Sequence, residues 1–565
     1  MTEHADPSPE DFDPASNPIL PRRSRAGPIL FAGVALIIAA VLIGRTLPTS
    51  SGGAPQATAG PERPRAGAPA APRTGEVQLR LVGAAPATWD PAAQSDAATA
   101  GTLAQVYEGL TAFDSASQVQ PALAADWELE EDGLRAVFTL RPGLRFSDGS
   151  PLGAPDVVRS WLRLLDPTAP SPLASLLADV EGAEAYRTGS GPSDAVGIHA
   201  RGEEVVVDFR RPAGHFVAAT ASPSLAVVPV GVPVGPGAAQ LPPDLVVSGA
   251  YIPRTENDTT IRLEANPHYW AGMPAITAVD LVTDLEGRSP VDVYTAGELD
   301  WTPVAAADAS WIRYDPDLGP QLRESRTLSV DYYGFDTTEP PFDDPLVRRA
   351  FSQAVDWDRL VELTSPESEP ATSLVPPGIP GRNETDTSPP FDPAEARALL
   401  AQAGYPGGEG FPAVGLSSSG YEYDEAIARQ LTQNLDVSVQ VETMPFEDLI
   451  TRLDTDPPQI WALTWIADYP DPFDFLGLLL ETGSTNNYSR WSSAQYDAAL
   501  EAAATTEDPG ERSRHYAEAE RILQQEAPLI PVSHGESWAL SREGLLGAGE
   551  SGLGLLRIAG MAWSE

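Results

Sequence analysis

The chain has 565 residues, of which 80 are acidic and 36 are basic, and its formal net charge is −44. This excess of negative charge is unfavourable for binding nucleic acids or other polyanions. The sequence contains no cysteine, which excludes disulfides, cysteine nucleophiles, thiolate metal sites and a lipid-modified cysteine. It also contains no lysine, which excludes the phosphate-binding loop of an ATPase.

An apolar, uncharged segment lies near the N-terminus, at residues 27–44. Its roughly 18 residues are enough to cross a bilayer as a helix. Arginines precede it closely, so the positive-inside rule places residues 1–26 in the cytoplasm and the bulk of the chain outside the cell. We therefore predict a single-pass membrane anchor, with a cleaved signal peptide as the alternative. Residues 45–75 are rich in Pro, Ala and Gly, which predicts an unfolded tether.

The exported part opens with strands and helices in alternation. Residues 77–82 alternate between apolar and polar side chains as a half-buried strand does, and residues 97–110 carry apolar side chains at helical spacing. Residues 121–140 predict a hairpin, because an Asp-Gly pair between two alternating segments suits a tight turn. Pro155 then suits the first turn of a helix with an apolar face.

A β-α-β-α-β order is predicted from Phe411 onward. The predicted helices are residues 425–434 and 446–453, and the strand between them is residues 437–443. Such alternation favours a parallel sheet, and ligands of open α/β sheets collect beyond the carboxyl ends of the strands. Asp468 and the loop that contains Ser418 both fall at such ends.

Asp468 is the candidate binding residue, in the stretch I-W-A-L-T-W-I-A-D-Y-P-D-P-F-D-F that starts at Ile460. The apolar run predicts a buried strand, which Pro470 ends because proline cannot continue a ladder. A carboxylate among aromatic rings is costly to desolvate unless a cation or several N–H donors meet it. The ammonium group of a ligand would serve. The alternative is that Asp468 only caps the proline-rich turn.

The sequence gives little support for catalysis or metal binding. Residues 535–539 and 415–419 approach a nucleophile elbow, but each lacks the closing glycine. The six histidines are scattered without the close spacing of metal ligands. The acidic groups at 128–132 and 468–474 lack the register of a calcium loop, so we predict solvated turns there. No catalytic residue, metal or cofactor is therefore predicted, and we expect a protein that is not an enzyme.

Several motifs resemble the family 5 solute-binding proteins, the extracytoplasmic receptors of ABC importers for oligopeptides, dipeptides and nickel complexes. They follow one another in the family's order along the exported part of the chain: P-A-L-A-A-D-W-E at 121, L-R-P-G-L-R-F-S-D-G at 140, A-N-P-H-Y-W-A-G-M-P at 265, P-P-F-D-D-P-L-V-R-R-A-F at 340 and W-I-A-D-Y-P-D-P at 465. Each motif alone is weak, and the ordered set is specific.

The resemblance implies a bilobal α/β fold, the type II periplasmic-binding-protein fold of the large peptide-binding subclass. Lobe I would comprise residues 76–327 and 529–565, with an inserted subdomain at about 114–215. Lobe II would comprise residues 328–528, so the chain would cross between the lobes near Leu328 and Pro528.

The resemblance also implies the binding residues. In peptide-binding relatives the aspartate of the W-x-x-D motif receives the ligand's α-ammonium group, and that position is Asp468 here. An arginine that meets the peptide carboxylate in oligopeptide-binding relatives falls at Ala462, which leaves the carboxylate contact and even peptide specificity open. Trp465, Tyr332, Tyr333 and Phe446 fall where relatives place the aromatic walls of the cleft, with core packing as the alternative for each of them. Ser418, in the loop beyond its predicted strand, is the remaining expected ligand contact.

The predicted function is the substrate-binding component of an ABC importer that captures peptides or peptide-like solutes between two lobes. Its expected partners are the permease and ATPase subunits and the membrane that its N-terminal helix would enter; we expect a monomer. A tethered sensor or peptide chaperone without transport is the first alternative, and an exported hydrolase the second. The sequence leaves open the ligand's identity and length, and whether nickel complexes bind.

Overall fold

The computed structural model describes residues 78–94, 96–169, 171–232, 240–257, 259–365, 368–506 and 508–564. These residues belong to one compact unit. Within them, no helix combines the length and the apolar composition needed to cross a membrane. The predicted anchor at 27–44 and tether at 45–75 lie outside the described residues.

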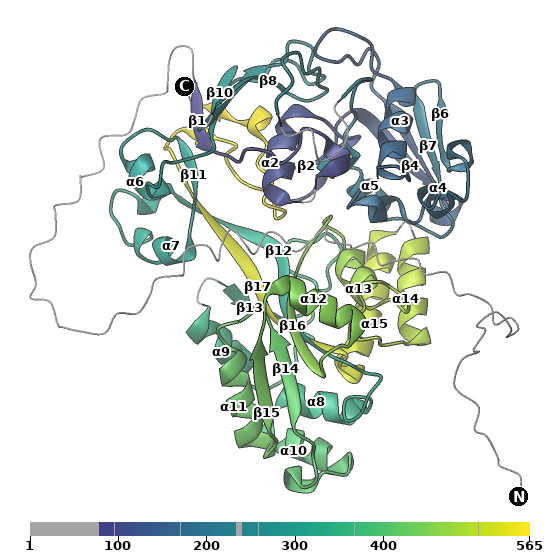
Figure 1. Ribbon diagram of the computed structural model, residues 1–565, viewed down its shortest axis with the longest axis vertical. Coiled ribbons are helices and arrows are strands. Elements are labelled where there is room, and N and C mark those ends of the chain that lie inside the picture. Colours follow the sequence, from purple (N-terminus) through teal and green to yellow (C-terminus); the bar gives the residue numbers. More distant parts are fainter. Residues whose placement is uncertain are drawn as a thin grey trace, which may run out of the picture. The chain divides into compact units, whose positions relative to one another are not determined.

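An eleven-stranded mixed sheet organises the fold (Figure 1). Its strand order is β15-β14-β16-β12-β17-β11-β1-β10-β9-β8, and β13 pairs with β17 off this path. The strands are β1 (Leu79–Val82), β8 (Tyr251–Glu256), β9 (Thr260–Ala265), β10 (Ala278–Val282), β11 (Trp301–Val304), β12 (Leu322–Phe335), β13 (Ser368–Pro370), β14 (Val414–Ser418), β15 (Val439–Thr443), β16 (Ile460–Ile466) and β17 (Leu529–Ser541).

The β14–β16 end of the sheet confirms the predicted β-α-β-α-β order. β14 pairs in parallel with both β15 and β16. Parallel neighbours need a crossover, and the chain supplies it with α11 (Asp424–Leu435) after β14 and α12 (Phe446–Thr455) after β15. The carboxyl end of β16 therefore lies beside the carboxyl ends of the parallel strands β14 and β15, as the sequence predicted.

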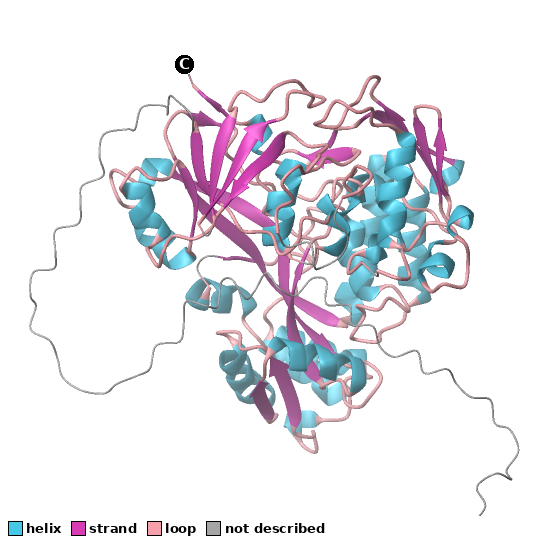
Figure 2. Cartoon of the chain, turned by 45° about the horizontal axis from the view of Figure 1, so that its top comes forward, coloured by secondary structure: helices cyan, strands magenta, loops and turns pink. Residues whose placement is uncertain are grey.

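Helices cover both faces of this end of the sheet (Figure 2). On one face, α12, α13 (Pro472–Leu480), α14 (Ala494–Thr505) and α15 (Pro509–Glu526) form a hydrophobic cluster with β12 and β16, which we call the α12–α15 core. On the other face, α8 (Pro345–Gln353), α9 (Trp357–Thr364), α10 (Pro393–Gln402) and α11 form the α8–α11 core. Apolar cover on both faces confirms the predicted α/β class.

The other end of the sheet contains β1, β11 and β8 to β10, with helices α2 (Ala97–Val106), α6 (Pro290–Thr295) and α7 (Ala306–Ile312) beside them. The first helix is shorter than the predicted 97–110. It ends at Val106 because the next residue, Tyr107, turns to extended backbone.

A separate four-stranded sheet, β4-β5-β7-β6, forms between β1 and β8 in the sequence. Its elements are β4 (Ala124–Glu130), β5 (Arg135–Leu140), β6 (Ile198–Arg201), β7 (Glu204–Asp208), α3 (Ala154–Leu164), α4 (Ala183–Arg187) and α5 (Phe216–Ala219). The predicted hairpin is confirmed as β4 and β5, whose turn places Asp132 and Gly133 at positive φ. Phe138, Trp161 and Phe216 pack edge to face in its centre, which we call the small-sheet core. Two further two-stranded pairs are β2 (Thr111–Phe113) with β3 (Val119–Pro121) and β18 (Leu545–Leu546) with β19 (Ala562–Trp563).

Strands β12 and β17 are the long elements that connect the two ends of the main sheet. They have 14 and 13 residues and pair antiparallel along most of that length. The pairing slips between Arg326 and Val330, where β12 begins to pair with β16 on its other side. Irregular pairing of this kind bends a strand locally.

Two helices begin at Asp-Pro pairs in the sequence, α8 at Asp344-Pro345 and α10 at Asp392-Pro393. The Asp344 side chain accepts a hydrogen bond from Leu346 N at 2.8 Å, at the start of α8. The Asp392 side chain accepts bonds from Ala394 N and Glu395 N, both at 3.0 Å, at the start of α10. In each case the aspartate satisfies free N–H groups of the first turn while proline fixes the backbone.

Candidate functional site

Asp468 lies directly beyond β16, in the short connection to α13. The backbone N–H of Ala467 donates to Leu328 O at 2.9 Å, which extends the contact between β16 and β12 by one residue. Asp471 then starts α13, because its side chain accepts from Phe473 N at 2.9 Å and Pro472 is the first helical residue.

The neighbours of Asp468 belong to two different hydrophobic cores. Ala467 packs in the α12–α15 core, and Tyr469 packs in the small-sheet core. Asp468 is half-buried between them. The chain therefore places a carboxylate at a junction of two apolar regions, where water contributes little to its solvation.

Asp474, the third residue of α13, holds the other side of this connection. It is fully buried, and its carboxylate accepts from the indole Nε1 of Trp465 at 2.8 Å and from the backbone N of Asp468 at 3.1 Å. Asp471 and Asp474 thus provide the turn's caps. Among the described residues, no hydrogen bond or ion pair engages the carboxylate of Asp468, so the capping alternative has no support there.

Burial dominates the electrostatics of the two acids. It raises the pKa of Asp468 to about 6. It also raises the pKa of Asp474 well above its usual range, and the nearby charge of Asp468 raises it further, although the hydrogen bond from Trp465 opposes this. A cation placed between them would favour the ionised form of both. The site is therefore chemically suited to a positively charged group.

The predicted contacts divide between the two faces of the sheet. Trp465 and Tyr332 lie in the α12–α15 core, on the same face as the Asp468 connection, and Phe446 is half-buried against that core at the start of α12. Tyr332 is enclosed and packs edge-on against Trp461 with ring centroids 5.6 Å apart.

Tyr333 and Ser418 lie on the opposite face, where the structure does not bring them to Asp468. The hydroxyl groups of both donate to the carboxylate of Asp424 in α11, the Ser418 bond being 2.5 Å long. Adjacent strand residues point to opposite faces, so Tyr332 and Tyr333 cannot both face one site. Ser418 is fully buried beneath its loop.

The sequence patterns did not reveal that the acidic residues at 468–474 are enclosed by the protein. We expected a solvated turn, and this is wrong, because Asp471 and Asp474 are buried. The signal was the D-P-F-D spacing, which places one acid at the helix cap and the other on the first turn, facing back toward the strand. Among the described residues, no group of three or more His, Asp or Glu side chains is arranged to hold a metal ion.

Comparison with known proteins defines the class. The family model described as bacterial extracellular solute-binding proteins, family 5, matches residues 118–487. The chain belongs to this family. It is an extracytoplasmic substrate-binding protein of the ABC-transporter type, which confirms the resemblance seen in its motifs, and its role is binding rather than catalysis.

Its relatives cover most of the chain. It is 32% identical over 462 residues to the probable deoxycholate-binding periplasmic protein YgiS of Escherichia coli. This alignment covers 79% of this chain and 86% of the relative. It is 26% identical over 474 residues to the oligopeptide-binding protein OppA of Bacillus subtilis, with 79% and 85% covered. The unliganded open form of the murein tripeptide binding protein MppA superposes with a TM-score of 0.75 at 25% identity, covering 86% of this chain and 97% of that one.

Proposed function

We propose that the protein captures a peptide or peptide-like solute through its ammonium group, which forms an ion pair with Asp468. The observation that carries this proposal is a half-buried carboxylate at the junction of two cores, with no protein cation on it among the described residues. Burial of such an acid is unfavourable on its own, and a ligand cation offsets that cost. Trp465 and Phe446 would supply apolar surface for the ligand's side chains, with Tyr332 packed behind them.

The two regions that meet at Asp468 are, in this proposal, two lobes. Lobe I comprises residues 76–327 and 529–565, including the small sheet in an inserted subdomain at about 114–215, and lobe II comprises residues 328–528. The slip in the β12–β17 pairing next to Leu328 supports a hinge there. Ligand binding would close the lobes and present the complex to an ABC permease and its ATPase subunits, with the binding protein acting as a monomer.

The proposal predicts that the ligand group at Asp468 is positively charged. The acid pair of Asp468 and Asp474 favours a cation and disfavours a carboxylate such as deoxycholate, the compound in the name of one relative. Asp468 and not Asp474 is the proposed contact, because Asp474 is fully buried and already accepts two hydrogen bonds.

The test is calorimetric titration of the full-length protein with a panel of peptides, each paired with its N-acetylated counterpart. Acetylation removes the ammonium group and leaves the rest of the peptide unchanged. We expect at least one free-amine peptide to bind and its acetylated partner to bind at least about tenfold more weakly. Equal affinity for both members of every binding pair, or binding of deoxycholate alone, would contradict the proposal.

We propose further that residues 27–44 anchor the protein in the membrane as a single span and that residues 45–75 are its tether. The apolar composition and length of the segment support this. After an alkaline wash, the protein should remain with the membrane pellet. Recovery of the full-length chain in the wash supernatant would contradict the anchor.

A further inference from the structure

The position of helix α13 sets the geometry of the candidate site. Asp474 on its first turn accepts both the Trp465 indole and the Asp468 backbone N–H. A shift of α13 therefore moves or breaks both hydrogen bonds. Whatever fixes α13 also fixes Asp468.

One end of α13 is fixed from within the same part of the sheet. Asp471, its N-cap, forms an ion pair with Arg512 of α15 at 2.8 Å and accepts from the Tyr516 hydroxyl at 3.2 Å. Asp471 is buried, so this pair is largely protected from solvent screening.

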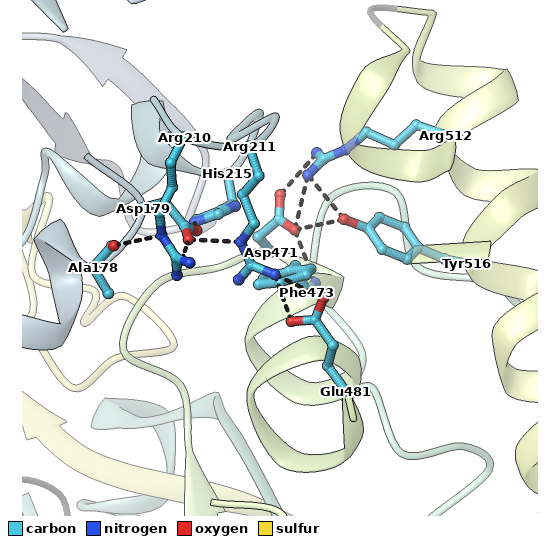
Figure 3. Close-up of polar contacts among 10 residues, drawn as sticks. All are labelled: Ala178, Asp179, Arg210, Arg211, His215, Asp471, Phe473, Glu481, Arg512 and Tyr516. Carbon is cyan, nitrogen blue, oxygen red and sulfur yellow. Dashed lines mark hydrogen bonds and ion pairs between the residues drawn. The ribbon is translucent and has the colours of Figure 1, made fainter. Parts of the chain in front are cut away.

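The other end of α13 is fixed from the small-sheet region (Figure 3). Glu481, the C-cap residue, accepts from Arg211 Nη1, which lies 2.7 Å from both carboxylate oxygens. Arg211 Nε donates in turn to Asp179 at 2.6 Å. Arg210 binds the same Asp179 at 3.2 Å, but its other hydrogen bond goes to Ala178 O and not to α13.

His215 contacts the same segment by stacking. Its ring lies parallel to Phe473, with centroids 4.8 Å apart, and nearly parallel to Tyr469, at 5.4 Å. Phe473 lies flat on its own helix because residue 477 is glycine: a Cβ there would approach the ring to 2.4 Å. His215 Nε2 lies 3.7 Å from Asp179, so the histidine and Arg211 share one carboxylate.

We infer that Arg211 and His215 are positioning residues for the ligand site: from the small-sheet region they hold α13, and through Asp474 they hold Trp465 and Asp468. Both act through Glu481, Phe473 and Tyr469 and not through the Asp468 carboxylate itself. The inference rests on the proposed function only for its consequence, a loss of ligand affinity. The positioning itself is a property of the ligand-free protein.

The test uses three tryptophan indoles as reporters of hydrogen exchange in the full-length protein. The Trp465 indole N–H donates to Asp474, whereas that of Trp161 donates to Leu225 O at 2.8 Å in the small-sheet core and that of Trp357 to Ser352 O at 2.7 Å in the α8–α11 core. Arg211→Glu should accelerate exchange at Trp465 by about tenfold and leave the other two within about twofold.

Two matched variants sharpen the test. The charge exchange Arg211→Glu with Glu481→Arg should restore part of the protection at Trp465, because it rebuilds the ion pair with residue 481 in reverse but leaves a carboxylate at position 211 beside Asp179. Arg210→Glu, which changes a neighbouring arginine on the same Asp179, should leave Trp465 within about twofold of wild type. An unaltered Trp465 in Arg211→Glu, or equal acceleration at all three indoles, would overturn the inference.

His215 provides a second pair of variants should Arg211→Glu fail to fold. His215→Ala should accelerate exchange at Trp465, whereas His215→Phe, which keeps a ring between Phe473 and Tyr469, should retain protection. Identical exchange at Trp465 in these two variants would refute the stacking contribution. Failure of every peptide to bind the wild-type protein would remove the proposed function, but the exchange result would still decide the positioning.

Discussion

Two aspartates on opposite faces of the same sheet, one buried and one half-buried, show what distinguishes a structural acid from a candidate ligand contact. Asp424, at the start of α11, accepts from the hydroxyl groups of Tyr333 and Ser418 and from Tyr421 N at 2.9 Å. Asp468, beyond β16, is only half-buried, and its carboxylate accepts no hydrogen bond from the part of the chain that the structure describes. Asp424 is satisfied by the fold, whereas Asp468 remains available for a cation.

The neighbouring Asp331 strengthens the comparison. It lies on the Tyr333 face of β12 and accepts from Thr464, from the Tyr423 hydroxyl at 3.1 Å and from Ser533 at 2.8 Å. Burial raises its pKa, and these hydrogen bonds oppose the increase. This face therefore contains a hydrogen-bonded polar network, which rigidifies a core. Acids of one residue type thus take different roles according to the donors that surround them.

The largest expected effect comes from removing the Asp468 carboxylate. Asp468→Ala should weaken binding of a free-amine peptide by roughly 2 to 5 kcal/mol, because truncation leaves the ligand's ammonium without its partner. Calorimetry measures this loss. The thermal stability of the Asp468→Ala variant should be unchanged or slightly higher than that of the wild type, because a partly buried, uncompensated charge is removed. Unchanged affinity would refute the site.

Asp424→Ala should show the reverse pattern. The substitution leaves the buried hydroxyl groups of Tyr333 and Ser418 without their hydrogen-bond acceptor, so the free energy of unfolding should fall by about 2 to 3 kcal/mol. Denaturant titration measures the fall. Affinity for the same peptide should change less than about threefold. A variant as stable as wild type would mean that this network contributes little to folding.

The pH dependence of binding should follow the Asp468 carboxyl. With a pKa of about 6, it is mostly protonated at pH 5 and mostly ionised at pH 7.5, so peptide affinity should be about tenfold higher at the upper pH. The stability has the opposite sign: because the folded pKa is raised, this acid's contribution falls as pH rises from about 4 through 6. Asp468→Asn should remove this acid's contribution to both dependences, and titration at the two pH values tests the affinity. A flat affinity profile in the wild type would contradict the assignment.

The smallest expected effect comes from Trp465→Phe, which keeps an aromatic ring but removes the indole N–H bond to Asp474. We expect a loss of about 1 kcal/mol in peptide affinity, or roughly fivefold. The matched variant Trp161→Phe removes an indole bond in the small-sheet core and should leave affinity unchanged. Equal losses in both variants would indicate a general loss of stability instead of a local effect.

The strand and helix order around the site followed from local patterns. Apolar periodicity, Asp-Pro helix starts and the Asp-Gly turn act within a few residues, so the sequence shows them directly. The assignment of Asp468 to the end of a strand was correct for this reason, and the ordered motifs led to the family. The predicted end of the first helix, residue 110, was wrong, because the helix stops where Tyr107 becomes extended.

The residues that contact the candidate site could not be predicted from short-range sequence patterns. The Asp474–Trp465 bond depends on how α13 returns against β16, and the Arg211–Glu481 pair joins residues 270 positions apart. Tyr332 and Tyr333 are adjacent in the sequence, yet the pleat of β12 assigns them to different cores.

The sequence by itself determined the family, the α/β class and the position of Asp468 at a strand end, because these depend on composition and short-range spacing. Only the tertiary structure decided that the carboxylates of Asp424 and Asp331 accept hydrogen bonds from the protein while that of Asp468 does not, among the described residues. That distinction depends on donors brought from distant segments, and in a low-dielectric interior those donors determine whether a carboxylate is part of the core or available to a ligand.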